Sequence, residues 1–214
     1  MEMLGRKSLD AEYEKIFLKK DEILNSLQEN KNVKCLGQKM NPVQKYLYTI
    51  NKKDEADSNE YKAIYKNFYG LGRFSSNDFV NEYFKELQIK KTEYENVDSK
   101  CVMDVIKHFQ PFTSSNQYSF STKLLHTINN DYPIYDSKVG RFYCGGTPNP
   151  AMETFEPFYK ELINEYKRIG GEKLLVKTIE YLDEKVGFGF ENISFVKKID
   201  FIIWRYQTII DNEK

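Results

Sequence analysis

A carboxylate, a lysine and a polar turn lie close together in the chain between Thr113 and Arg141. The carboxylate is Asp136, in the stretch YPIYDSKV, and the lysine is Lys123, in the preceding segment YSFSTKLLH. A carboxylate can stabilise positive charge that develops at a reacting carbon, and a neutral lysine amine can attack such a carbon. The residue types therefore predict a candidate site around Asp136 and Lys123.

Both residues also have an ordinary structural interpretation. Pro133 cannot continue the preceding helix, so Asp136 stands where the next helical segment, SKVGRFY, begins. An aspartate at that position caps the helix and contributes about 1 kcal/mol to stability. Lys123 could be a solvated surface residue. The residues alone leave both interpretations open.

The segment FTSSNQYSF predicts a polar turn directly before a helix. Backbone N–H groups at a helix start attract anions, because the helix dipole is positive there. We therefore expect this turn and the basic residues just beyond Asp136 to contact phosphate. The expected contacts are Ser114, Ser115, Asn116, Gln117, Lys138 and Arg141.

Histidine and tryptophan offer fewer candidates. His108 and His126 lie far apart and lack the spacing of a metal-binding motif, so neither a metal site nor a cofactor is expected. Trp204 is the single tryptophan and lies off the main apolar stripe of its segment. Its ring could stack on a nucleic-acid base. The alternative is that the ring is partly buried beside Phe201.

The elements that must position these residues are predicted to be helices. Apolar side chains recur at steps of three and four in the segments 151–169, 172–186 and 195–210. Earlier helices are expected at about 9–28, 43–53, 58–69, 77–88, 99–109 and 119–129, with starts near Asp10, Asn41, Asn77, Asp98 and Ser119. The best strand candidate is the short NVKCLG. The sequence predicts an all-α domain over residues 1–214, which could divide into lobes 1–110 and 111–214 around a cleft.

Charge and cysteine content limit the partners. Lys+Arg and Asp+Glu number 32 each, so any nucleic-acid contact must come from a local patch. The first residues lack the apolar core of a signal peptide, and no apolar run reaches bilayer length, so no membrane contact is expected. Cys35, Cys101 and Cys144 form no CxxC pair, which favours a reducing, cytoplasmic setting.

The order of polar turn, lysine-bearing helix and PIYDSKV resembles the helix-hairpin-helix DNA glycosylase superfamily. Within that superfamily, the resemblance is closest to bacterial proteins that have an 8-oxoguanine-DNA-glycosylase-like fold. The sequences that carry it are SFSTKLLH…YPIYDSKV and, near the end, IDFIIWRYQ. The resemblance covers about residues 113–142, with a looser similarity at 199–207. It implies that Asp136 matches the aspartate that caps a helix and serves catalysis. It also implies that Lys123 matches the nucleophilic lysine of bifunctional members. A base that leaves the stack needs a pocket to receive it, and we expect Trp204 and His126 to contribute to that pocket.

Three hypotheses about function follow. We favour a glycosylase that excises a modified or damaged base from DNA, in repair or phage defence, with Asp136 stabilising an oxocarbenium-like transition state and Lys123 giving optional lyase activity. The usual Leu-Pro-Gly-Val-Gly hairpin is absent, and PFTSSNQYS stands in its place. This departure favours a second hypothesis, an inactive DNA-binding module of a defence system. A helical ribonuclease or toxin ranks last, because the Arg-polar-His spacing of such enzymes is absent around His108 and His126.

Overall fold

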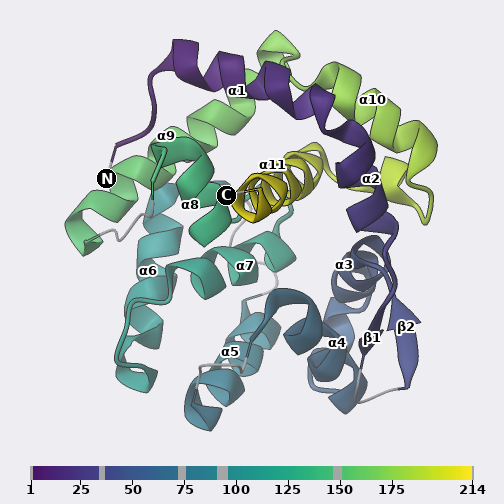
Figure 1. Ribbon diagram of the computed structural model, residues 1–214. Helices are drawn as coiled ribbons and strands as arrows, with labels where there is room; N and C mark the ends of the chain where they lie inside the picture. The colour runs from purple at the N-terminus through teal and green to yellow at the C-terminus, as the bar shows by residue number, and fades with distance from the viewer. Residues whose placement is uncertain (1, 34–36, 72–75, 91–95, 147–150, 214) are drawn as a thin grey trace.

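Helices form nearly all the regular structure of the chain (Figure 1). The computed structural model describes residues 2–33, 37–71, 76–90, 96–146 and 151–213. The helices before residue 110 are α1 (Arg6–Leu18), α2 (Lys20–Gln28), α3 (Pro42–Asn51), α4 (Asn59–Tyr69), α5 (Asn77–Ile89) and α6 (Ser99–Phe109). The later helices are α7 (Tyr118–Ile128), α8 (Ser137–Cys144), α9 (Met152–Glu172), α10 (Val176–Lys185) and α11 (Phe195–Asn212). The predicted all-α class is confirmed.

Only short pieces of other regular structure occur in the described ranges. Strand β1 (Lys31–Val33) pairs antiparallel with β2 (Gln38–Met40). The predicted strand NVKCLG begins in β1, and its residues 34–36 lie outside the described residues. Single 3-10 turns lie at Lys53–Glu55, Gln110–Phe112 and Phe190–Asn192.

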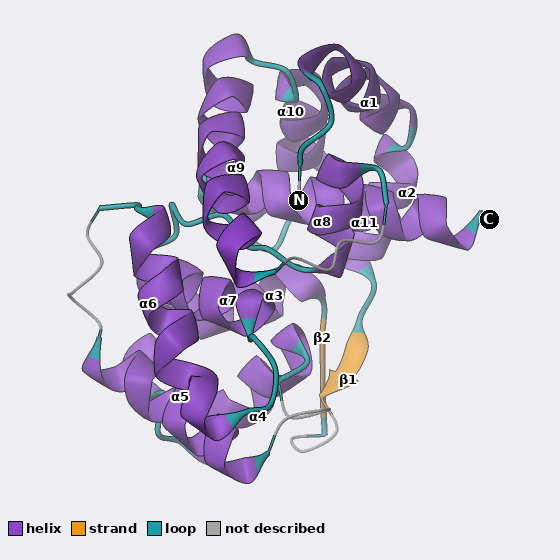
Figure 2. Cartoon of the chain, turned by 90° about the vertical axis from the view of Figure 1, so that its left-hand side faces the viewer, coloured by secondary structure: helices purple, strands orange, loops and turns teal. Residues whose placement is uncertain are grey.

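The two ends of the chain pack against each other. Helices α1 and α2 contact α10 and α11, and α11 also contacts α8 and α9. Figure 2 shows these helices in one group and α3 to α7 in a second group beside it. The groups meet through contacts of α6 with α9 and of α2 with α3. In the described ranges, no helix combines the length and the apolar composition needed to cross a bilayer. The division into lobes 1–110 and 111–214 stays a prediction.

The prediction of a single helix over 9–28 is wrong in one respect, because this range contains parts of two helices, α1 and α2. Helix α1 ends and α2 begins on either side of Lys19, whose φ of −101° and ψ of 12° leave helical geometry. Ile16 and Ile23 are both fully buried, so the break lets the apolar residues on each side of Lys19 reach the core. Lysine carries no helix-breaking signal, which is why periodicity alone predicts a continuous helix.

Two of the predicted helix starts are confirmed as caps. The Asn41 side chain accepts a hydrogen bond from Gln44 N (2.9 Å), and Gln44 Oε1 accepts one from Asn41 N (3.0 Å), which together form a capping box. Asp98 caps α6 through the N–H of Lys100 at 3.1 Å. Helices α5 and α7 also start where predicted, at Asn77 and Tyr118, but their N-cap residues are Ser76 and Gln117. Helix α1 starts earlier than predicted, at Arg6 after Gly5.

Aromatic side chains build the core. The largest fully buried side chains are all tyrosine or phenylalanine, and buried tyrosines need partners for their hydroxyls. Tyr65 Oη, for example, lies 2.7 Å from Tyr83 Oη and 3.0 Å from Thr127 Oγ1. Tyr159 Oη donates to the carbonyl of Pro133 at 2.6 Å, and this bond fixes the segment that leads to Asp136.

Candidate functional site

Three hydrogen bonds hold the carboxylate of Asp136 at the start of α8. Its Oδ1 accepts from the backbone N–H groups of Lys138 (2.9 Å) and Val139 (3.1 Å). Its Oδ2 accepts from the indole N–H of Trp204 at 2.8 Å. The side chain is half-buried. The predicted helix cap is confirmed, and both carboxylate oxygens have fixed directions.

A buried threonine ties α7 to the segment before α8. Thr122 Oγ1 accepts a hydrogen bond from Tyr135 N at 3.0 Å and lies 3.2 Å from the Tyr135 carbonyl oxygen. Thr122 is fully buried, so this link belongs to the core. Because Lys123 follows Thr122 and Asp136 follows Tyr135, the link holds the two candidate residues on adjoining pieces of backbone.

Lys123 is enclosed on one side by aromatic rings. Its Nζ donates to the Tyr69 carbonyl at 3.2 Å and lies 5.8 Å and 5.1 Å from the ring centroids of Tyr69 and Phe120. Burial disfavours the ammonium form and lowers the pKa of Lys123, while the negative charges of Asp136 and Asp200 act in the opposite direction. The interpretation of Lys123 as a freely solvated surface residue is therefore wrong.

A second lysine, which sequence reasoning missed, lies deeper than Lys123. Lys197 Nζ is 2.5 Å from Asp200 Oδ2, and both side chains are buried. Lys197 Nζ also lies 5.7 Å from the Tyr69 ring, the ring that Lys123 flanks. Lys197 and Asp200 are three residues apart on a predicted apolar helix, and a charged pair at this spacing is the signal that could have identified them.

Burial shifts the protonation of this second pair toward its neutral form. It lowers the pKa of Lys197 and raises the pKa of Asp200, in each case against the opposing charge of the partner. The charge of Asp136 acts on both groups, as it does on Lys123. Lys123, Asp136, Lys197 and Asp200 are called the polar centre below.

Two buried oxygen atoms, one in the polar centre and one beside it, lack a hydrogen-bond partner. They are Asp200 Oδ1 and Tyr69 Oη, and neither has a partner among the described residues. A buried polar atom without a partner costs about 1–3 kcal/mol unless a water or a ligand satisfies it. The centre therefore has hydrogen-bonding capacity that the described side chains do not use.

Trp204 is half-buried, and its indole N–H is committed to Asp136. The guanidinium carbon of Arg205 lies 4.8 Å from the Trp204 ring centroid. Burial lowers the pKa of Arg205 to about 10. A base-stacking role for Trp204 stays a prediction. Its hydrogen bond makes it part of the frame that orients Asp136.

His126 lies in the core. It is 0% exposed, and its Nδ1 is 2.7 Å from the carbonyl oxygen of Tyr132. A carbonyl oxygen only accepts, so Nδ1 carries the proton, and Nε2 accepts from the hydroxyl of Tyr46 at 3.1 Å. Burial, aided by the charge of Lys197, lowers the pKa of His126 to about 3. The ring is therefore neutral, and a base could contact it only after the core opened.

The predicted phosphate contacts of α8 are occupied by a carboxylate. Asp211, in the last turn of α11, lies 2.5 Å from Lys138 Nζ and 2.7 Å from Arg141 Nη1. The hydrogen bond from Lys138 is the main cause of a lowered pKa of Asp211. Lys138 and Arg141 thus join α8 to α11, and a phosphate would have to displace Asp211 to reach both cations.

The other predicted phosphate contacts lie in the turn before α7. Ser114, Ser115 and Asn116 are exposed. Gln117 Nε2 donates to Thr113 Oγ1 at 2.9 Å and to Ser115 Oγ at 3.0 Å, so the turn is closed by its own side chains. None of the described side chains caps the first turn of α7.

The polar centre combines a fixed carboxylate with a lysine of lowered pKa, which are groups that can stabilise a cation and attack a carbon. Comparison of the chain with protein-family models, curated proteins and solved structures gives no match. The functional argument therefore starts from the chemistry of the polar centre itself.

Proposed function

We propose that this protein is a DNA glycosylase-like enzyme that excises a modified or damaged base, with Asp136 as its catalytic carboxylate. The observation that carries the proposal is the carboxylate fixed by α8 and Trp204, with its charge acting on Lys123. The resemblance of residues 113–142 to helix-hairpin-helix DNA glycosylases supports the same function.

Cleavage of an N-glycosidic bond is favoured by a fixed carboxylate such as Asp136. Breaking an N-glycosidic bond develops positive charge on the sugar, and an oriented carboxylate lowers the energy of that state. Asp136 is oriented by three N–H groups before any substrate arrives, so little reorganisation is needed during the reaction.

Lys123 would supply the lyase activity. Its lowered pKa increases the fraction of neutral amine, which is the form that attacks the anomeric carbon of the sugar as the bond to the base breaks. Opening of the sugar ring then gives the Schiff base, with the ring oxygen taking up the proton that the amine loses. Lys197 has a lowered pKa as well, but its ammonium is committed to Asp200 and is enclosed by rings. Lys123, which is only half-buried, is therefore the lysine that a substrate could reach.

DNA binding would depend on the turn at 114–117 and on α8. These contacts position the backbone without reading sequence. In the free protein Asp211 takes the place of a phosphate between Lys138 and Arg141. A DNA phosphate that binds there would replace the Asp211 carboxylate as the negative partner of these two cations.

A DNA-binding module without excision activity is the second candidate. The observation that favours it is that each oxygen of Asp136 already has a partner within the fold, as a purely structural cap requires. In this function Asp136 and Trp204 only join α8 to α11.

The deciding experiment compares wild type with Asp136→Asn on duplexes that carry a panel of base lesions. We expect base release by wild type and a loss of about 100-fold or more in the variant, because the charge is gone while asparagine can still cap α8. Asp98→Asn is the matched control, since it makes the same change at the start of α6, and it should keep full activity. Base release at the wild-type rate by Asp136→Asn would remove Asp136 from the mechanism.

Two further readouts separate the candidates. Borohydride should trap a covalent adduct with wild type and not with Lys123→Met, because only a Schiff base is reduced to a stable bond. Salt-dependent DNA binding without product, at equal affinity in wild type and Asp136→Asn, would favour the binding module. Absence of DNA binding by wild type would reject both candidates.

A further inference from the structure

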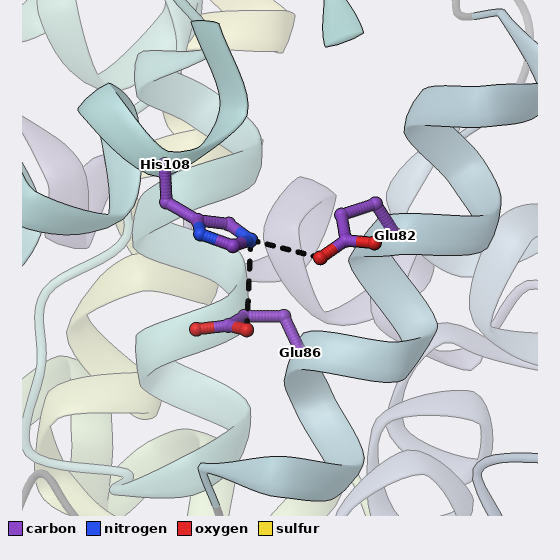
Figure 3. A group of neighbouring side chains, drawn as sticks. All are labelled: Glu82, Glu86 and His108. Atoms are coloured by element: carbon purple, nitrogen blue, oxygen red, sulfur yellow. Dashed lines mark hydrogen bonds and ion pairs between the residues drawn. The ribbon is translucent and has the colours of Figure 1, made fainter. Parts of the chain in front are cut away.

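A histidine and two glutamates face one another where α5 packs against α6, on other helices than the polar centre (Figure 3). His108 Nε2 lies 3.1 Å from Glu82 Oε1 and 3.5 Å from Glu86 Oε2. Figure 3 shows both carboxylates extending from α5 toward this one ring nitrogen. Glu82 and Glu86 are one helical turn apart, so the helix itself places them on the same face.

The spacing suits a single cation. One ligand atom from each of the three residues lies within 4.8 Å of the other two. Zinc binds histidine nitrogen and carboxylate oxygen at about 2.0–2.2 Å, which places tetrahedral ligands about 3.4 Å apart. A small rotation of the two glutamate side chains would bring the three ligand atoms from their present spacing to the spacing that zinc requires.

Glu86 gives an independent reason to expect a cation. The residue is only 4% exposed. Its carboxylate lies 3.5 Å from His108 Nε2 and 3.8 Å from Lys90 Nζ, and both distances are longer than a charge-assisted hydrogen bond. A buried carboxylate is costly unless a close cation compensates it.

Glu82 is better compensated than Glu86. Its carboxylate lies 3.2 Å from Lys85 Nζ as well as 3.1 Å from His108. Glu82 therefore already has two cationic partners beside the position where the three ligand atoms meet.

We infer that Glu82, Glu86 and His108 form a binding site for a divalent transition-metal cation, best fitted by zinc. Three protein ligands leave a fourth position for water. An imidazole ligand favours zinc over magnesium or calcium, which prefer oxygen ligands alone. The His108 side chain is 37% exposed, so the ion can enter from solvent. The bound ion would join α5 to α6, independently of the function proposed for the polar centre.

The first test uses tag-free wild-type protein and the nitrogen resonances of its imidazole rings during titration with zinc chloride. The chain has two histidines, and both ring nitrogens of His126 are hydrogen-bonded inside the core. We expect the His108 ring to shift, the shift to saturate at one equivalent of zinc, and the His126 ring to stay unchanged. Magnesium at the same concentration should leave both rings unchanged. Absence of a His108 shift at saturating zinc would overturn the site.

The second test measures zinc affinity by calorimetry in matched variants. Glu86→Gln removes the charge of the buried ligand, and we expect its zinc affinity to fall at least 10-fold. Glu180→Gln makes the same change at an exposed position of α10 and should bind as wild type does. Equal affinity in all three proteins would mean that zinc binds elsewhere, and would overturn the assignment. The resonance experiment needs no variant, so it remains decisive if Glu86→Gln does not fold.

Discussion

Mild acid should destabilise this protein through His126. The ring is fully buried, with Nδ1 donating to Tyr132 and Nε2 accepting from Tyr46. An added proton would place an uncompensated charge in the aromatic core, near the ammonium of Lys197. The pKa of His126 is therefore lowered to about 3 from an ordinary value of 6.5.

The size and the sign of the change in stability follow from the difference between the pKa values of His126 in the folded and the unfolded chain. The unfolded chain takes up the proton near pH 6.5, while the folded chain does not until about pH 3. The stability contributed by neutral His126 is thus complete above pH 6.5 and is lost as the pH falls toward 3. The slope is about 1.4 kcal/mol per pH unit, so lowering the pH to 5 costs about 2 kcal/mol.

Urea unfolding at pH 7.5 and pH 5 measures this loss in wild type and in His126→Asn. Asparagine cannot titrate, and its amide can still donate to the Tyr132 carbonyl. The wild type should lose about 2 kcal/mol more than the variant, because losses from other groups are common to both proteins. Equal losses in wild type and His126→Asn would refute the buried, neutral ring and would favour the base-pocket role predicted from the sequence.

Two further predictions concern the charged pairs of α11. Lys197→Met should lower the free energy of unfolding by about 3–5 kcal/mol, because Asp200 is left buried without its partner. In the double variant Lys197→Met with Asp200→Leu, the free energy of unfolding should fall by less than about 1 kcal/mol. Chemical denaturation measures both proteins, and equally large losses in the single and the double variant would contradict this account. Asp211→Asn should tighten DNA binding, since it frees Lys138 and Arg141. Fluorescence anisotropy at several salt concentrations should show a log–log slope steeper by about 1–2, and an unchanged slope would exclude both cations from the DNA contact.

Local chemistry made much of the helical framework predictable. The apolar spacing in 151–169, 172–186 and 195–210 corresponds to α9, α10 and α11. The combination of Pro133 with a following aspartate predicted the cap at Asp136, because both signals act within a few residues. The break at Lys19 was missed, since the packing of α1 and α2 on α10 and α11 sets it and the local sequence does not.

The partners of the candidate residues were not predictable in the same way. Trp204 and Asp136 are 68 residues apart and meet only because α11 packs on α8. The same packing brings Asp211 to Lys138 and Arg141. Periodicity shows which face of a helix is buried, but it does not show which other helix covers that face. The link between Asp136 and Trp204 and the neutralisation of the basic pair therefore required the structure.

A carboxylate with a partner on each oxygen need not be inert. The two backbone N–H groups bind Oδ1, which leaves Oδ2 with the single donor of Trp204 and capacity for further contact. Trp204→Phe separates the two roles of Asp136, because it removes that donor and leaves both the charge and the cap of α8. A structural Asp136 predicts a loss of stability of about 1.5–3 kcal/mol without any change in the chemistry of bound DNA. A catalytic Asp136 predicts slower base release at saturating DNA as well, since the carboxylate loses its orientation toward the sugar.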